Sequence, residues 1–243
     1  MSTWRRFLQV PEAAAGVAIV GMLALMALTA PLLFPGDPLA IAARPMLPPL
    51  ADPAVPLGTD RLGRDVAAGI AHGARTSLGV ALAAALAALA IGSLVGTVAG
   101  LSGGLVDDGL MRVTEAFQTV PGFLLALAFV SVAGGSAGVV AASIALSAWT
   151  EPARLARAEV LAIRQSDYVA NARVAGMHPV AIALREVLPN ALPPVLALAA
   201  VIVAASVLIE ASLSFLGLGD PNRVTWGGMI AEGRAVLRAA PWL

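Results

Sequence analysis

Few side chains in this sequence are of the types that catalyse reactions or bind metals. It has two histidines, His72 and His178, and no cysteine, which excludes thiolate zinc sites, iron–sulfur clusters and a cysteine nucleophile. All fifteen basic residues are arginine, and a phosphate-binding P-loop needs a lysine, so this chain has no P-loop with which to hydrolyse ATP. We therefore expect this chain to have no catalytic residue, no metal site and no cofactor of its own.

The charged residues are balanced in number and segregated along the chain. Fifteen acidic residues cancel the fifteen arginines, so no net charge attracts nucleic acid. Four long runs contain no acidic, arginine or histidine side chain, at residues 13–36, 76–106, 116–150 and 187–209. With 59% apolar residues, 12% charged residues and a mean hydropathy of +0.87, the composition excludes a soluble globular protein. It predicts an all-α polytopic membrane protein.

These runs set the number of membrane-spanning helices, because a helix needs about 20 mostly apolar residues to cross a bilayer. The glycine-rich turn at residues 134–138 divides the longest run into two, so we expect five spans. Their expected ranges are 13–34, 76–101, 115–133, 137–156 and 191–211. The first is too long for a cleaved signal peptide. Five spans leave the chain ends on opposite sides, so a sixth span is expected to be missing at the C-terminus.

The orientation is predicted from the arginines beside the spans. A cytoplasmic N-terminus, residues 1–12, places eight arginines inside and seven outside, which decides nothing by itself. Long external loops carry little weight in the positive-inside rule. Arg5 and Arg6 before the first span and Asp37 after it favour a cytoplasmic N-terminus and an external loop at residues 35–72.

The expected external loop has two parts. Residues 35–57 contain seven prolines, which is typical of an extended, irregular segment. In the following residues, Asp60 and Asp65 alternate with Arg61 and Arg64, so local ion pairs could hold a short amphipathic helix on the membrane surface. One interpretation is a structured lead into the second span. The alternative is a contact surface for an external soluble partner.

The second span contains three glycines spaced four residues apart, Gly92, Gly96 and Gly100. Small residues at this spacing lie on one helix face and let another backbone approach closely. We expect this face to pack against another helix of the same chain, with a seam between subunits as the alternative.

Residues 152–189, between the fourth and fifth spans, carry five arginines yet keep the periodicity of an amphipathic helix. Gly176 and Pro179 predict a break between two helices, because glycine adopts the left-handed conformation that ends a helix and proline suits a first helical turn. Pro189 marks the approach to the fifth span. Such a helix–turn–helix suits the docking of a partner, and a helix resting on the lipid surface is the alternative.

Several motifs together resemble one family, the binding-protein-dependent ABC importer permeases, and within it the C-type subunit of the dipeptide, oligopeptide and nickel branch. The loop between the fourth and fifth spans resembles the family's EAA loop through Asp167, Tyr168, Ala172, Arg173, Gly176, Pro189 and Asn190. The external segment resembles the same branch through Gly58, Thr59, Asp60, Gly63, Arg64 and Asp65. Further matches lie at residues 107–112, 121–127 and 210–219.

The resemblance implies a type I ABC importer transmembrane domain over residues 73–243, in which residues 157–190 form coupling helices that sit in a groove of the ATPase. It implies four partners: a second, B-type permease subunit, two ABC ATPase subunits that bind ATP and Mg²⁺, and an external solute-binding protein. The location implied is a bacterial inner membrane. Ala170, Asn171 and Glu186 depart from the family pattern within the loop.

The function expected is therefore that of a permease subunit forming the path for peptides or a related small solute. A secondary transporter or channel driven by an ion gradient is the alternative. That class usually needs ionisable residues or broken helices inside the membrane, and the predicted spans are free of charge. Glu210, at the outer end of the fifth span, adjoins an uncharged run. We expect a helix-end acid that is hydrogen-bonded to neighbouring backbone, with a pore role as the alternative.

Overall fold

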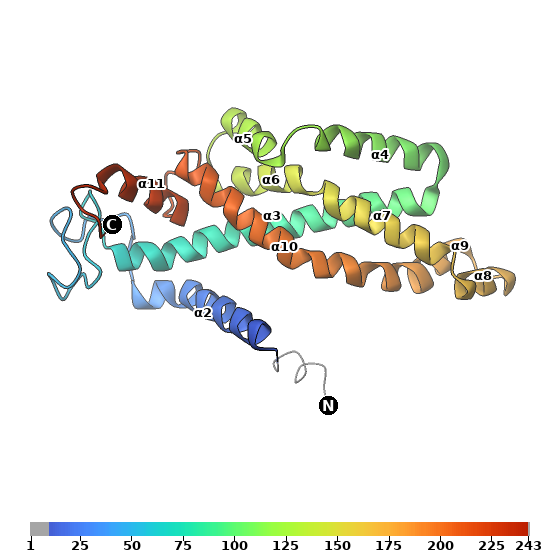
Figure 1. Ribbon diagram of the computed structural model, residues 1–243, viewed down its shortest axis with the longest axis horizontal. Helices are drawn as coiled ribbons and strands as arrows, with labels where there is room; N and C mark the ends of the chain where they lie inside the picture. Colours follow the sequence, from blue (N-terminus) through green and yellow to red (C-terminus); the bar gives the residue numbers. More distant parts are fainter. Residues whose placement is uncertain (1–9, 243) are drawn as a thin grey trace. The chain divides into compact units, whose positions relative to one another are not determined.

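The computed structural model describes residues 10–242 and consists of helices joined by turns and irregular segments (Figure 1). Arg5 and Arg6, on which the expected orientation depends, lie outside the described residues. The chain divides into two compact units, one of Met1–Gly79 with Ala211–Leu243 and the other of Val80–Glu210. The all-helical membrane architecture is confirmed. Within residues 10–242, three helices are long and apolar enough to span a membrane, or four if one bent pair counts as a span, so five spans remain a prediction.

The first unit contains helices at both ends of the chain. These are α2 (Pro11–Leu33), the first part of α3 (Val66–Ser102), the last part of α10 (Leu188–Phe215) and α11 (Trp226–Val236). Helix α2 coincides with the first predicted span. Residues 35–65, all of them described, form turns and one isolated bridge between Thr59 and Asp65. The short amphipathic helix expected in this loop is therefore wrong, because the aspartates bind local backbone N–H groups and favour turns.

The second unit contains the remainder of α3 and α10 and the shorter elements between them. These are α4 (Gly104–Gln118), α5 (Gly122–Ala133), α6 (Ala137–Ala148), α7 (Thr150–Arg164), α8 (Asp167–Val174), α9 (Pro179–Ile182) and the π-helix η1 (Ala183–Val187). Helix α9, η1 and α10 follow one another without interruption, so one helical rod runs over Pro179–Phe215. It therefore begins inside the predicted loop, well before the predicted start of the fifth span.

Two of the predicted spans each correspond to two helices in the structure, and one of these pairs is sharply bent. The expected helix at residues 115–133 is two helices, α4 and α5, bent by 83°. Pro121 stands at the bend, where its ring removes an N–H donor and disfavours a helical conformation at the residue before it. The expected helix at residues 137–156 corresponds to α6 and α7, which meet at Trp149. This residue keeps helical angles, its N–H bonds to the Ala145 carbonyl and its carbonyl accepts from the Ala153 N–H, so the helical turn continues through it. Helix α6 alone is about 18 Å long at 1.5 Å per residue, short of the roughly 30 Å bilayer core.

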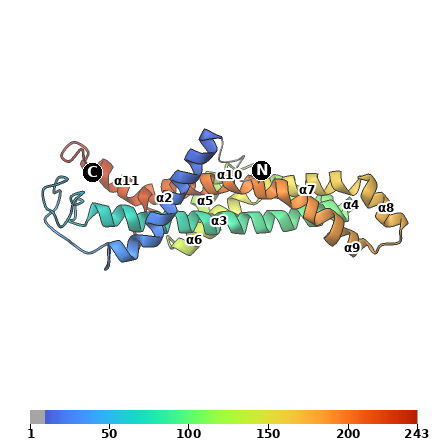
Figure 2. The same ribbon diagram turned by 90° about the horizontal axis from the view of Figure 1, so that it is seen from below.

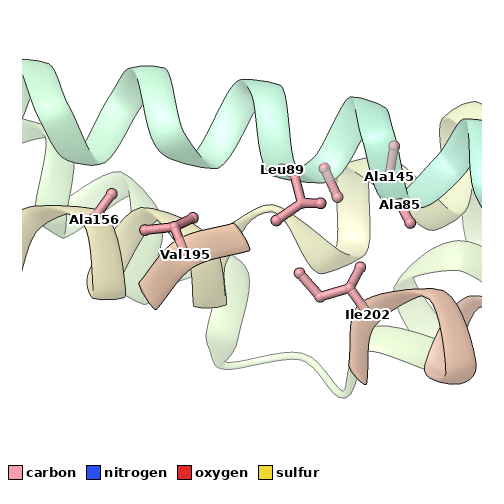
Figure 3. Close-up of a cluster of buried hydrophobic side chains, with 7 residues drawn as sticks. Ala85, Leu89, Ala145, Ala156, Val195 and Ile202 are labelled. Atoms are coloured by element: carbon pink, nitrogen blue, oxygen red, sulfur yellow. The ribbon is translucent and has the colours of Figure 1, made fainter. Parts of the chain in front are cut away.

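The core of the second unit joins four helices through small and branched apolar side chains. Ala85, Ala88 and Leu89 of α3 meet Ala145 of α6, Ala156 of α7, and Val195 and Ile202 of α10 (Figure 3). The side chains of Leu89 and Ile202 point toward one another across this cluster. Alanine contributes little volume, so the helix backbones approach closely and the second unit holds its helices in a fixed arrangement.

Candidate coupling loop and external motif

The predicted coupling loop is anchored to its unit by one apolar side chain of α8. Val169 is fully buried and packs with Val160 of α7 and with Ile182, Val187 and Ala191 of the rod that follows. Figures 1 and 2 show α8 and α9 together at the end of the unit that the C-terminal end of α7 also reaches. Burying a valine side chain stabilises by about 1.5–3 kcal/mol. Helix α8 is therefore attached to the bundle as a rigid element.

The side chains of α8 that resemble the family motif lie mostly on its outer surface. Asp167 and Arg173 are exposed, Tyr168 is 42% exposed and Ala172 is half-buried. The guanidinium of Arg173 donates to the backbone carbonyl of Arg164 at 3.5 Å. The helix thus presents one acidic, one aromatic and one basic side chain outward, while Val169 is buried against the unit.

The end of α8 is formed as the sequence predicted. Gly176 has a φ of 78°, and its N–H bonds to the Arg173 carbonyl while the N–H of Met177 bonds to the Ala172 carbonyl, both at 3.0 Å. This pair of bonds is a Schellman motif, which satisfies the last carbonyls of a helix. Pro179 then occupies the first turn of α9. The turn between α8 and α9 is therefore specified by local backbone chemistry.

Pro189 and Asn190 lie inside a helix rather than before one. Pro189 follows η1 directly and is the second residue of α10, and Asn190 donates from Nδ2 to the Glu186 carbonyl at 2.7 Å. Proline cannot supply the backbone donor of a regular helical turn, and the wider π turn just before it accommodates that loss. These two residues connect the coupling loop to α10 and are not part of the exposed face of α8.

The glycine face of α3 lies against α7 within the same unit. A Cβ atom at Gly92 would collide with the Trp149 carbonyl, and one at Gly96 with the Ala153 carbonyl. At Gly100 it would lie 2.7 Å from Cγ1 of Val160. Ordinary carbon contacts are about 3.5–4.0 Å. The spacing of three glycines therefore serves a close helix–helix approach inside the chain.

One ion pair links α4 to α7, and the sequence analysis did not predict it. Arg157 donates from Nε to Oδ1 of Asp107 at 2.5 Å and from Nη2 to Oδ2 at 2.7 Å. The carboxylate side chain is 10% exposed and the arginine side chain 33%. Fifty residues separate the two partners along the chain. The one sequence signal for this pair was the position of Asp107, which directly follows an uncharged run and lies within a family motif.

The external motif packs against the proline-rich segment and forms one compact loop with it. The hydroxyl of Thr59, which is fully buried, donates to the Arg44 carbonyl at 2.6 Å and accepts from the Leu47 N–H at 3.0 Å. Gly58 and Gly63 have positive φ angles of 78° and 84°, and a side chain at either would strike the backbone of the neighbouring segment. These residues therefore hold the loop together.

The charged residues of the motif do not pair with one another as expected. Oδ1 of Asp60 accepts from the N–H groups of Leu62 and Arg64 at 2.8 and 2.9 Å. Asp65 accepts from the N–H of Ala67 at the start of α3. The guanidinium of Arg64 instead lies 3.7 Å from Oε1 of Glu232 in α11. The expectation of local ion pairs is corrected, because backbone donors occupy the aspartates.

A cavity of about 340 Å³ lies between this motif and α11, inside the first unit. Its walls carry both signs of charge, including Asp60, Arg64, Arg223 and Glu232. Burial and the neighbouring Asp60 carboxylate hold the pKa of Glu232 above its ordinary value, with Arg64 and Arg61 acting in the opposite direction. The sequence analysis missed Glu232, since α11 lies far along the chain from the motif.

Trp226, at the start of α11, ties that helix to α3. Its indole N–H donates to the Ile70 carbonyl at 3.0 Å, and its backbone N–H donates to the Ser77 hydroxyl at 3.2 Å. Gly73 accommodates the ring, because a Cβ there would lie 3.0 Å from the indole. This contact fixes the position of α11 and hence of Glu232.

The two histidines and Glu210 are the remaining candidate residues. Nε2 of His72 lies 3.1 Å from the Phe34 carbonyl, and Nδ1 of His178 accepts from the Val180 N–H at the start of α9. Glu210 is 1% exposed and lies five residues before the end of α10. Among residues 10–242, no three histidine or acidic side chains lie close enough to hold a metal ion.

Comparison with known proteins finds two matching family models. The model described as binding-protein-dependent transport system inner membrane component matches residues 92–240. The model described as N-terminal TM domain of oligopeptide transport permease C matches residues 2–49. Residues 50–91 lie between the two matched segments and include the external motif at residues 58–65.

Three curated relatives illustrate the similarity. A probable peptide ABC transporter permease of Sinorhizobium fredii is 39% identical over 93% of this chain and 77% of its own length. The oligopeptide transport system permease OppC of Escherichia coli K12 is 34% identical over 98% of this chain and 80% of its own length. The dipeptide transport system permease DppC of Bacillus subtilis is 33% identical over 98% of this chain and 75% of its own length.

Proposed function

Since this chain belongs to the binding-protein-dependent transport system inner membrane components, we propose that it forms part of the path for peptides or chemically related small solutes and that α8 couples it to an ATPase. It is a permease subunit of an ABC transporter of the inner membrane, and not an enzyme. The peptide class rests on the names of the relatives, a probable peptide permease, an oligopeptide permease and a dipeptide permease.

One observation carries the coupling role of α8. The helix is buried on one side through Val169 and exposes Asp167, Tyr168 and Arg173 on the other. A partner that binds the exposed side therefore moves α7 and the start of the following rod together with α8, because the same apolar cluster joins all three. This is how closure of a partner is converted into a change of the helix bundle.

The proposal includes the partners and the orientation. A second, B-type permease completes the pathway, two ATPase subunits bind ATP and Mg²⁺ and engage α8, and an external binding protein delivers the solute. The N-terminus is cytoplasmic, which places the external motif at residues 58–65 outside the membrane. The arginines before α2 and the long external loop support this orientation.

The test is uptake by the complete transporter, reconstituted in proteoliposomes with its ATPases, binding protein and labelled peptide. Uptake that needs ATP inside and survives collapse of the proton gradient is expected. Uptake that persists without ATP and stops when the gradient collapses would identify a secondary transporter instead.

The turn at Gly176 tests the coupling role within that system. A valine there would be forced into a left-handed backbone, at about 1–2 kcal/mol, although no atom lies within 4 Å of the new Cβ position. Gly176→Val is expected to reduce uptake per assembled complex, and Gly176→Asn, which tolerates this conformation, to retain most of it. Normal uptake by Gly176→Val would refute the role of α8.

A further inference from the structure

Two arginines project from α7 toward the corner where α3 ends and α4 begins. Arg157 makes both hydrogen bonds of its guanidinium fork to Asp107 in the first turn of α4, at 2.5 and 2.7 Å. Two turns further along α7, Arg164 donates from Nη1 to the carbonyl of Gly100 in the last turn of α3. Residues seven apart lie on the same face of a helix, so α7 holds both sides of this corner from one face.

The turn between α3 and α4 is made of two glycines, which can adopt many backbone angles. Gly103 and Gly104 join the two helices with positive φ angles of 70° and 54°, and no atom lies within 4 Å of a Cβ position at either. Neither sterics nor packing at these glycines sets the angle between α3 and α4. The bidentate contact of Asp107 with Arg157 therefore holds the start of α4 against α7, while Arg164 holds the end of α3.

The same helix also carries the anchor of the coupling loop. Val160 lies between Arg157 and Arg164 in the sequence and belongs to the apolar cluster that contains Val169 of α8. Leu101, beside the corner, packs against the same cluster. One short stretch of α7 therefore contacts α8 through apolar side chains and the α3–α4 corner through charged ones.

We propose that Arg157, with Asp107 as its partner, is a positioning residue for transport: the pair makes α4 move with α7 whenever an ATPase moves α8. The inference rests on the proposed function, since it concerns how movement of α8 reaches the rest of the permease. A bidentate arginine–carboxylate pair suits this task because it fixes orientation as well as distance. Arg164 supports it by holding the end of α3.

The test uses the complete transporter in proteoliposomes and measures uptake and ATP hydrolysis on the same samples, normalised to assembled complex. Arg157→Gln and Asp107→Asn are expected to lower the number of peptides imported per ATP hydrolysed by roughly tenfold, within the range of mutations that alter coupling between sites. A purely structural defect would reduce assembled complex and leave this ratio unchanged. Glu115→Gln is the matched control, because it breaks the exposed pair with Arg112 on the same helix.

A double variant keeps the test decisive if the single variants fail to assemble because they leave one buried charge unpaired. Asp107→Cys combined with Arg157→Cys leaves no unpaired charge, and the chain has no other cysteine. A flexible bifunctional thiol reagent should restore the import ratio that the untreated double variant has lost. An untreated double variant with the wild-type ratio would overturn the proposal. A wild-type complex that shows no ATP-driven uptake would instead refute the proposed function itself.

Discussion

The close approach of α3 to α7 makes Gly96 a position where one added methyl group should have a large effect. A Cβ there would lie 2.9 Å from both the Ala153 carbonyl carbon and the Ala156 Cβ, and closer still to the Ala153 carbonyl oxygen. Carbon atoms in contact are ordinarily about 3.5–4.0 Å apart. Because backbone atoms of α7 are among those struck, no side-chain rotation relieves the collision and the two helices must separate.

The magnitude follows from comparison with Gly79 on the same helix. Alanine gains about 1 kcal/mol over glycine inside a helix at either site. No atom lies within 4 Å of a Cβ at Gly79, whereas overpacking at Gly96 costs about 1–3 kcal/mol. The difference between Gly96→Ala and Gly79→Ala cancels the backbone effect and isolates the packing, so Gly96→Ala should be the less stable variant by about 1–3 kcal/mol.

The assay is thermal unfolding of the full-length chain purified in one detergent, with both variants measured beside the wild type. At about 2–4 °C per kcal/mol for a chain of this size, the Gly96→Ala midpoint should lie several degrees below that of Gly79→Ala. Equal midpoints, or a more stable Gly96→Ala, would refute the claim that the glycine face packs directly on the α7 backbone.

Three further changes have outcomes that the contacts determine. Val169→Ala removes two buried carbons at about 0.8 kcal/mol each, and with the cavity left behind it should destabilise the second unit by about 2 kcal/mol, measured by thermal unfolding; no loss would contradict the anchoring of α8. Thr59→Val leaves the Leu47 N–H and the Arg44 carbonyl without their hydroxyl partner, at about 1–3 kcal/mol, so trypsin should cleave after Arg44 faster than in the wild type. The pKa of Glu232 is raised by burial and by Asp60, so the folded state binds this proton more tightly than the unfolded state, and stability should fall as the pH rises from the ordinary glutamate value through the raised one. Glu232→Gln should remove that part of the dependence in melting curves taken across this range, and an unchanged profile would contradict it.

The features that could be predicted from the sequence are those specified by neighbours in the chain. Gly176 and Pro179 end one helix and start the next through bonds within a few residues, and both were placed correctly. The bend at Pro121 had the same kind of local signal, although the length of the apolar run outweighed it in the prediction. The division between α6 and α7 at Trp149 had no such signal, and it is slight, because the residue keeps helical angles.

The features that could not be predicted join distant segments. Asp107 and Arg157, or Arg64 and Glu232, meet only after the helices have packed, and nothing in the charge order along the chain identifies which arginine each acid will face. The spacing of Asp60, Arg61, Arg64 and Asp65 suggested pairs among themselves. In the structure the aspartate carboxylates accept hydrogen bonds from nearby backbone N–H groups instead, because these donors lie only two to four residues away along the chain.

Main-chain hydrogen bonds tie the external motif to the proline-rich segment, in addition to the side-chain bonds of Thr59 and Asp60. The N–H groups of Ala42 and Ala43 bond to the Gly63 carbonyl, that of Met46 to the Asp60 carbonyl and that of Thr59 to the Leu47 carbonyl. Several side chains on its outside, such as Ile41 and Leu50, are more than three-quarters exposed. The fold of this loop thus does not depend on its most exposed side chains, so substitutions at Ile41 and Leu50 should change the surface of the loop and leave its backbone as it is.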